Sequence, residues 1–282
     1  FPSDATEATK IDMISHLVPT EQQLEWQQME LTAFLHFGIN TFTGNEWGNG
    51  KDDAQIFNPT QLDCEQWVKA LKDAGFKMAI LTAKHHDGFC LWQTNTTDHS
   101  IKNSLWKDGK GDVVKECAEA CRRGGIKFGV YLSPWDRHEK TWGSEKYNDF
   151  YVGQLTELLT NYGKIDILWF DFTYPDKPAL DAETSPLRYH WWVKEWMEGK
   201  SKDDWESEKM EALIRKLQPE IIVNNRMGID QDLWTPEQYT PEEWRKHPET
   251  GELVVWESCQ TFSGSWGYNR DEMSWKSPKM LI

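Results

Sequence analysis

The sequence has 282 residues, of which 38% are hydrophobic, and it carries a formal net charge of −15 at pH 7. Such a charge argues against a nucleic-acid partner, because contact with phosphate groups needs a basic face. No stretch of the sequence approaches the roughly 20 consecutive apolar residues that a membrane-spanning helix needs. We therefore expect a globular protein without a membrane span, whose length suits one large α/β domain or two modest domains.

The first residues and the cysteines bear on the compartment. The sequence begins Phe1-Pro2-Ser3-Asp4, with neither a methionine nor an apolar leader, which is compatible with a secretion signal that has been removed. The five cysteines are an odd number without framework spacing, and Cys117 and Cys121 lie one helical turn apart, as packing thiols do. We expect a secreted or periplasmic protein whose oligomeric state the sequence leaves open.

A unit of helix, glycine and short apolar strand recurs along the chain. Its copies are QLDCEQWVKALKDAGFKMAILT, DVVKECAEACRRGGIKFGVYL and YNDFYVGQLTELLTNYGKIDILWF, with a weaker fourth, EKMEALIRKLQPEIIV, in which Pro219 replaces the glycine. Glycines such as Gly75 and Gly163 are placed to end the helices. The segments TAFLHFG and LVVWES flank these units and are also predicted to be strands.

Helices that alternate with nearly all-apolar strands predict a parallel sheet covered on both faces. Polar side chains follow each predicted strand: His36, then His85 and His86, Ser133 to Asp136, Asp171, and Asn224 to Arg226. Convergence at the carboxyl ends of strands is typical of a (β/α)8 barrel. A doubly wound sheet is the alternative, but the Gly-rich phosphate turn that it would need is not in the sequence.

We expect one catalytic (β/α)8-like TIM barrel over residues 1–282. A Trp-rich insertion is expected at about residues 173–206, and its tryptophans are Trp191, Trp192, Trp196 and Trp205. The whole chain holds 17 tryptophans. Aromatic rings stack on the apolar faces of sugars, so this number is consistent with carbohydrate binding as well as with ordinary packing.

The segment LTAKHHDGFCLW places two adjacent histidines at a strand end, where they fit a metal site, an acid/base site or a pocket for hydroxyl groups. Metal-dependent barrel hydrolases present two histidines two residues apart on the first strand, where this chain has only His36. Adjacent His85 and His86 would point to opposite sides of a continued strand. A serine nucleophile is disfavoured, because Ser133 lacks a G-x-S-x-G elbow.

Paired carboxylates are the remaining chemistry, and hydrolysis of a glycosidic bond needs two of them. Asp171 in ILWFDF lies at the end of a predicted strand, between aromatic residues. Its partner is Glu237 in WTPEQY or Glu257 in VWESC. The residues alone leave that choice open.

The sequence resembles the α-L-fucosidases of glycoside hydrolase family 29. The matching motifs are FLHFGINTFTGNEWG, AILTAKHHDGFCLW, GDVVKECAEACRRGGIKFGVYLSPWD, YGKIDILWFD, IIVNNRMG and VWESCQTFSGSWGYN, in the family's order from about residue 30 onward. The resemblance implies a retaining exo-α-L-fucosidase on a (β/α)8-like barrel, acting on fucosylated oligosaccharides or glycoconjugates without metal or cofactor. Because the family continues past SPKMLI, we expect the barrel to lack its last strand or strands and the family's C-terminal β-sandwich.

The resemblance also implies roles for individual residues. Asp171 matches the nucleophile, and Glu237 matches the acid/base, with Glu257 as the alternative. Residues matching those that hydrogen-bond fucose hydroxyls are His36, Glu46, Trp47, His85 and His86. Residues matching the lining of the same pocket are Tyr131, Trp169, Arg226 and Trp266. The competing hypotheses are a fucose-binding barrel without turnover and a metal-dependent barrel hydrolase.

Overall fold

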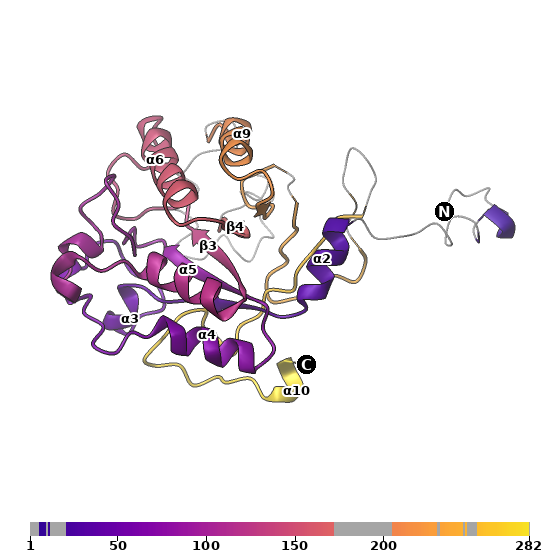
Figure 1. The fold of residues 1–282 in the computed structure, drawn as a ribbon, viewed down its shortest axis with the longest axis horizontal. Helices are drawn as coiled ribbons and strands as arrows, with labels where there is room; N and C mark the ends of the chain where they lie inside the picture. Colours follow the sequence, from indigo (N-terminus) through magenta and orange to yellow (C-terminus); the bar gives the residue numbers. More distant parts are fainter. Residues whose placement is uncertain are drawn as a thin grey trace, which may run out of the picture.

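The computed structural model describes residues 6–9, 11, 21–171, 205–229, 232–244, 246 and 253–281 (Figure 1). The strands are β1 (Thr32–Leu35), β2 (Met78–Lys84), β3 (Lys127–Leu132), β4 (Ile167–Trp169) and β5 (Ile222–Val223). The main helices are α2 (Glu21–Met29), α3 (Asn40–Thr43), α4 (Cys64–Asp73), α5 (Val113–Gly124), α6 (Lys146–Asn161), α9 (Ser207–Leu217) and α10 (Pro278–Leu281). Of the expected Trp-rich insertion, only Trp205 and Glu206 lie within the described residues.

The helices begin and end where local side chains favour it. Asp63 and Asp112 cap α4 and α5 by accepting a hydrogen bond from the backbone N–H three residues later. Gly75 and Gly163, just beyond α4 and α6, have φ angles of 91° and 76°, which confirms their predicted place at the helix ends. None of the described helices has the length and apolarity that a membrane crossing requires.

Five strands in the described residues form one parallel sheet in the order β1-β2-β3-β4-β5. Each strand pairs with the next one in sequence, whereas a doubly wound sheet reverses its order part-way. Beyond β5 the parallel pairing continues as isolated bridges, Asn224 to Leu233, Trp234 to Trp256 and Glu237 to Cys259. The predicted parallel α/β fold is confirmed. The predicted strand LVVWES is wrong, because this segment makes isolated bridges only.

The two faces of the sheet are buried in two different cores. In β2, Ala79 and Leu81 face the helices, while Met78 and Ile80 face the opposite side, as the period of a strand requires. Helices α4, α5, α6 and α9 lie around the outside of the sheet (Figure 1). The inner core, on the other face, also contains residues far apart in sequence: Trp26, Met29, Leu233 and Cys259. The sheet therefore curves around this inner core.

The inner face is built in rows of side chains that lie level across the strands. One row contains Phe34, Ile80, Gly129, Ile167 and Ile222, each paired with the next. Gly129 leaves room for its large neighbours, because a Cβ there would lie 2.3 Å from Ile167 Cγ2 and 3.1 Å from Ile80 Cγ1. The next row toward the carboxyl ends contains Thr82, Tyr131 and Trp169.

A bulge near the end of β2 changes the direction of its last side chains. Thr82 pairs with Tyr131, but Lys84 pairs with Leu132, so Ala83 is an extra residue. Lys84 consequently lies among the side chains of α6, where its Nζ is 5.3 Å from the centre of the Tyr151 ring. The strand ends at Lys84, which frees the following residues from strict alternation.

Lys84 forms a buried ion pair with Asp136, which follows β3. Their side chains are 0% and 1% exposed and their charged atoms are 3.0 Å apart. Burial acts to raise the pKa of Asp136, but Lys84 and the backbone N–H groups of Glu139 and His138 outweigh it, so that the net pKa lies below its ordinary value. The pair joins the end of β2 to the loop after β3.

We expect Gly129→Ala to destabilise the protein by about 1–3 kcal/mol, because the added methyl group overpacks the inner core. The control is Gly153→Ala in α6, where the new Cβ meets only Thr96 Cγ2 at 3.1 Å and helix propensity improves by about 1 kcal/mol. Urea unfolding of both variants measures the difference. Equal stability of the two variants would contradict the packing of Gly129.

We expect Asp136→Asn to destabilise the protein by about 3–5 kcal/mol at neutral pH, because the charge of Lys84 then stays buried without its partner. Because the pKa of Asp136 is lowered in the folded protein, the charged carboxylate stabilises the fold fully above its ordinary pKa of 3.8. This stabilisation is lost as the pH falls through the lower pKa of the folded state, so the difference between the unmodified protein and the variant should disappear in acid. The control is Asp73→Asn, which breaks the exposed pair with Lys69 and should cost about 0–1 kcal/mol. Denaturant unfolding at several pH values provides the measurement.

Candidate active site

Two carboxylates and one guanidinium group form the centre of the site. Asp171 follows β4, Arg226 follows β5, and Glu237 belongs to the bridged segment beyond it. Arg226 Nη1 donates to Asp171 Oδ1 at 2.9 Å, and Arg226 Nη2 donates to Glu237 Oε2 at 2.7 Å. One planar cation thus holds both acids, as the fork geometry of arginine allows.

The second oxygen of Asp171 faces β2 and β3. Tyr131 donates its O–H to Asp171 Oδ2 at 2.5 Å, and His86 Nε2 lies 3.3 Å from the same oxygen. Burial raises the pKa of Asp171 to about 7, although Arg226 acts to lower it, and the charge of Glu237 adds to the rise. Asp171 therefore changes between its protonated and its ionised form near neutral pH.

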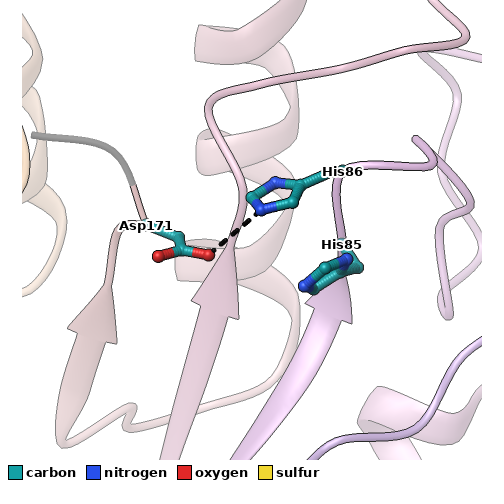
Figure 2. Close-up of side chains that lie close together, drawn as sticks. All are labelled: His85, His86 and Asp171. Atoms are coloured by element: carbon teal, nitrogen blue, oxygen red, sulfur yellow. Dashed lines mark ion pairs between the residues drawn. The ribbon is translucent and has the colours of Figure 1, made fainter. Parts of the chain in front are cut away.

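The histidines of the site, His85 and His86 buried and His36 half-buried, are held in their neutral form. Figure 2 shows His85 and His86 at the end of β2, with the His86 ring directed at Asp171. Burial lowers the pKa of His36 to about 4 and lowers the pKa values of His85 and His86 well below the ordinary value. Neutral imidazoles both donate and accept hydrogen bonds, which suits the recognition of hydroxyl groups.

One group of three side chains in the described part of the chain has donor atoms close enough together to hold a metal ion. It consists of His85, His86 and Asp171, whose donor atoms all lie within 4.8 Å of one another. Both oxygens of Asp171 already accept hydrogen bonds, from Arg226 and Tyr131. A divalent cation there would also lie against the guanidinium charge. The donor set therefore fits a polar pocket better than a metal site.

Aromatic rings surround the histidines. The Trp47 ring centre is 5.0 Å from that of His86, and the Tyr131 ring stacks on that of His85 at 5.5 Å. Tyr131 also stacks on Trp169 at 5.6 Å. The guanidinium carbon of Arg226 lies 4.8 Å from the centre of the Trp169 ring, which adds a cation–π contact to its two ion pairs.

The carboxylate of Glu257 is hydrogen-bonded to this aromatic layer and does not contact Asp171 or Arg226 in any described hydrogen bond. Its Oε1 accepts hydrogen bonds from Trp169 Nε1 at 2.7 Å and from Thr235 Oγ1 at 2.8 Å. Burial raises its pKa, and these two donors act in the opposite direction. Glu257 thus holds the Trp169 ring in place, while Glu237 faces Asp171 across Arg226.

The segment after residue 260 reaches the opposite side of the site. The backbone N–H of Trp266 donates to Glu46 Oε1 at 2.5 Å, which joins residues 220 positions apart. Gly267 packs against His36, since a Cβ there would lie 2.7 Å from His36 Nδ1. In Figure 1 this yellow segment passes close to the region of α3.

Every site residue predicted from the sequence lies in this connected set of contacts. The sequence did not indicate the ion pair of Lys84 with Asp136, nor the contacts of Ser133 with His86 and of Thr235 with Glu257. A lysine at the end of the mostly apolar strand MAILTAK was a signal for the ion pair, because a buried charge needs a partner. The contacts of Ser133 and Thr235 have no comparable sequence signal.

Comparison with known proteins identifies the family of this chain. The sequence matches the family model described as Alpha-L-fucosidase over residues 11–282. It is 47% identical over 214 residues to Alpha-L-fucosidase 1 of Arabidopsis thaliana, covering 76% of this chain and 38% of that protein. It is 27% identical over 261 residues to the plasma alpha-L-fucosidase of Rattus norvegicus, covering 87% of this chain and 50% of that protein.

Solved structures show the same relationship. A glycoside hydrolase 29 family member from an unknown rumen bacterium superposes with a TM-score of 0.76 at 39% identity, covering 90% of this chain and 48% of that one. For alpha-L-fucosidase isoenzyme 1 from Paenibacillus thiaminolyticus the TM-score is 0.75 at 29% identity, with 93% and 66% covered. The chain spans 38% of the plant protein, about half of the rat protein and of the rumen-bacterium protein, and 66% of the Paenibacillus protein. The chain belongs to the alpha-L-fucosidase family, glycoside hydrolase family 29.

Proposed function

We propose that this protein is a retaining exo-α-L-fucosidase that hydrolyses terminal α-L-fucose from oligosaccharides or glycoconjugates by double displacement. Family membership supports the sugar and the class of reaction. The observation that carries the proposal is the contact of one guanidinium group, that of Arg226, with both Asp171 and Glu237. Two carboxyl groups so closely held fit a retaining enzyme, in which their separation is about 5–5.5 Å.

In the first step Asp171 attacks the anomeric carbon of fucose and forms a covalent fucosyl-enzyme. Arg226 and Tyr131 direct hydrogen bonds at its two oxygens and hold them in a fixed orientation. Glu237 gives a proton to the departing oxygen, and then takes a proton from the water that releases the sugar. Neutral His36, His85 and His86 bind hydroxyl groups of the sugar.

Glu237 is assigned as the acid/base and Glu257 as a positioning residue. The Glu237 side chain is 38% exposed, so it can meet both a leaving group and a water molecule. Glu257 instead accepts hydrogen bonds from Trp169 and Thr235 through a single oxygen. This assignment agrees with the family resemblance, which matches Glu237 to the acid/base.

A (β/α)8-like barrel is part of the same proposal. Sequential parallel pairing supports it, and so does the continuation of that pairing through Leu233 and Trp256. Trp26, before β1, donates its Nε1–H to the carbonyl oxygen of Trp256 at 3.3 Å, which joins the two ends of the sheet. An inner core shared by both ends is the arrangement that a closed barrel requires.

We expect the unmodified protein to release the aryl group from an aryl α-L-fucoside. We expect Asp171→Asn to lower the rate of this reaction by about 10⁴-fold or more, because the nucleophile is lost. Circular dichroism should show that the variant stays folded. NMR spectroscopy of the first product formed should show α-fucose, and β-fucose would contradict retention. Fucose binding without turnover would indicate a binding protein, and inactivation by a chelator would indicate a metal-dependent hydrolase.

We expect Glu237→Gln to lower kcat by about 10²–10⁴-fold, with the smallest loss for substrates that have good leaving groups, because proton donation is lost. Azide should restore part of the rate by attacking the fucosyl-enzyme without help from a base. Glu257→Gln is the matched control, in which azide should have no effect. Rescue by azide in Glu257→Gln instead would exchange the roles of the two glutamates.

A further inference from the structure

Ser133 contacts the site but takes no part in the reaction described above. It follows β3 and is fully buried. Its hydroxyl donates to the carbonyl oxygen of Trp135 at 2.7 Å, and the same Oγ lies 2.6 Å from His86 Nδ1. A serine hydroxyl has one hydrogen to donate. Since the Trp135 carbonyl takes that hydrogen, Oγ accepts a hydrogen bond from His86, and the hydrogen of the imidazole is on Nδ1.

The other ring nitrogen of His86 then carries a lone pair. The residue is 2% exposed, and burial, with the positive charges of Arg137 and Lys84, holds its pKa well below the ordinary value. The ring is therefore neutral. Its Nε2 faces Asp171 Oδ2 at 3.3 Å, as Figure 2 shows. Two acceptor atoms that face each other repel unless a hydrogen lies between them.

We propose that Ser133 is a positioning residue, which fixes His86 as the Nδ1–H tautomer so that Nε2 accepts a hydrogen bond from the group facing it. In the free site that group is Asp171, whose carboxyl proton lies on Oδ2 and points at Nε2. Before Asp171 attacks, this proton leaves to solvent and Glu237 takes one up, so that the two acids together keep the one proton that the departing oxygen receives. In the complex, which rests on the proposed function, a hydroxyl of fucose donates to Nε2 instead.

The charged and titratable groups around this contact come from every neighbouring strand end. They are His36 after β1, Lys84 and His85 at the end of β2, Tyr131 and Arg137 in and after β3, and Arg226 and Glu237 beyond β5. Tyr131 donates to the same oxygen of Asp171, and Arg226 donates to the other. Both of these donors are directed at Asp171, and the contact between its Oδ2 and His86 Nε2 at 3.3 Å is the one that the carboxyl proton occupies.

The tautomer is measurable in the free protein without any substrate. NMR spectra of protein labelled with ¹⁵N-histidine contain signals from eight histidines, and those of His86 are identified by their loss in His86→Gln. We expect His86 at pH 7 to be neutral, with its hydrogen on Nδ1. A hydrogen on Nε2, or a doubly protonated ring, would overturn the proposal. This result does not depend on whether the protein is a fucosidase.

The kinetic test uses Ser133→Ala, in which Nδ1 loses its acceptor and the ring is free to carry its hydrogen on Nε2. That hydrogen then stabilises the Asp171 carboxylate, so the acidic limb of kcat/KM for an aryl α-L-fucoside should move to lower pH by about one unit. KM should rise about tenfold, because Nε2 no longer accepts from the sugar. Azide should not restore the rate.

The matched control is Ser104→Ala, which removes another buried serine hydroxyl that donates to a backbone carbonyl, that of Ile101 at 2.7 Å. Its pH profile and KM should equal those of the unmodified protein. A folded Ser133→Ala variant with an unchanged pH profile would overturn the proposal. If that variant does not fold, the proposal is tested by the tautomer of His86 in the unmodified protein. Absence of fucosidase activity in the unmodified protein would refute the proposed function and leave the tautomer to be judged by NMR.

Discussion

One guanidinium group that holds two acids together is the interaction on which the rest of the site depends. Two neighbouring carboxylates in a partly buried site repel each other, and without Arg226 neither would keep a defined charge and orientation. Arg226 is itself held by the ring of Trp169, and Trp169 is held by Glu257. Glu257 thus acts on Asp171 and Glu237 through the Trp169 ring and the Arg226 guanidinium group. This chain of contacts explains how three acids lie in one region with different partners.

The sheet supplies these groups because its inner face changes character from one row to the next. The row with Gly129 is apolar and closely packed, whereas the next row presents Tyr131 and Trp169 to the site. At the end of β2 the bulge at Ala83 sends Lys84 to the helices and leaves the two histidines on the inner side. A strand without the bulge would direct Lys84 inward, next to Arg226 and the carboxylates it balances.

The sequence allowed prediction of those features that depend on local patterns. Apolar runs and glycines such as Gly75 marked the helix–strand units, and motif resemblance identified the residues that converge. It did not allow prediction of the bulge, because Ala83 looks like any other residue of an apolar strand. The segment around Trp256 has the composition of a strand, but it pairs at isolated residues only. The choice between Glu237 and Glu257 also depends on contacts made across the fold, with Arg226 and with Trp169, that no local pattern contains.

The pairing register of β3 connects the stability of the sheet to the charge of Asp171. Its two oxygens are bound by groups from different strands, Tyr131 in β3 and Arg226 beyond β5. A shift of one residue in β3 would turn Tyr131 toward the helices and bring an apolar neighbour to the site. Asp171 would then lose a hydrogen bond that favours its charged form, and burial would keep it protonated. Close packing around Gly129 opposes such a shift, so the inner core, remote from any substrate, helps to set the charge of the proposed nucleophile.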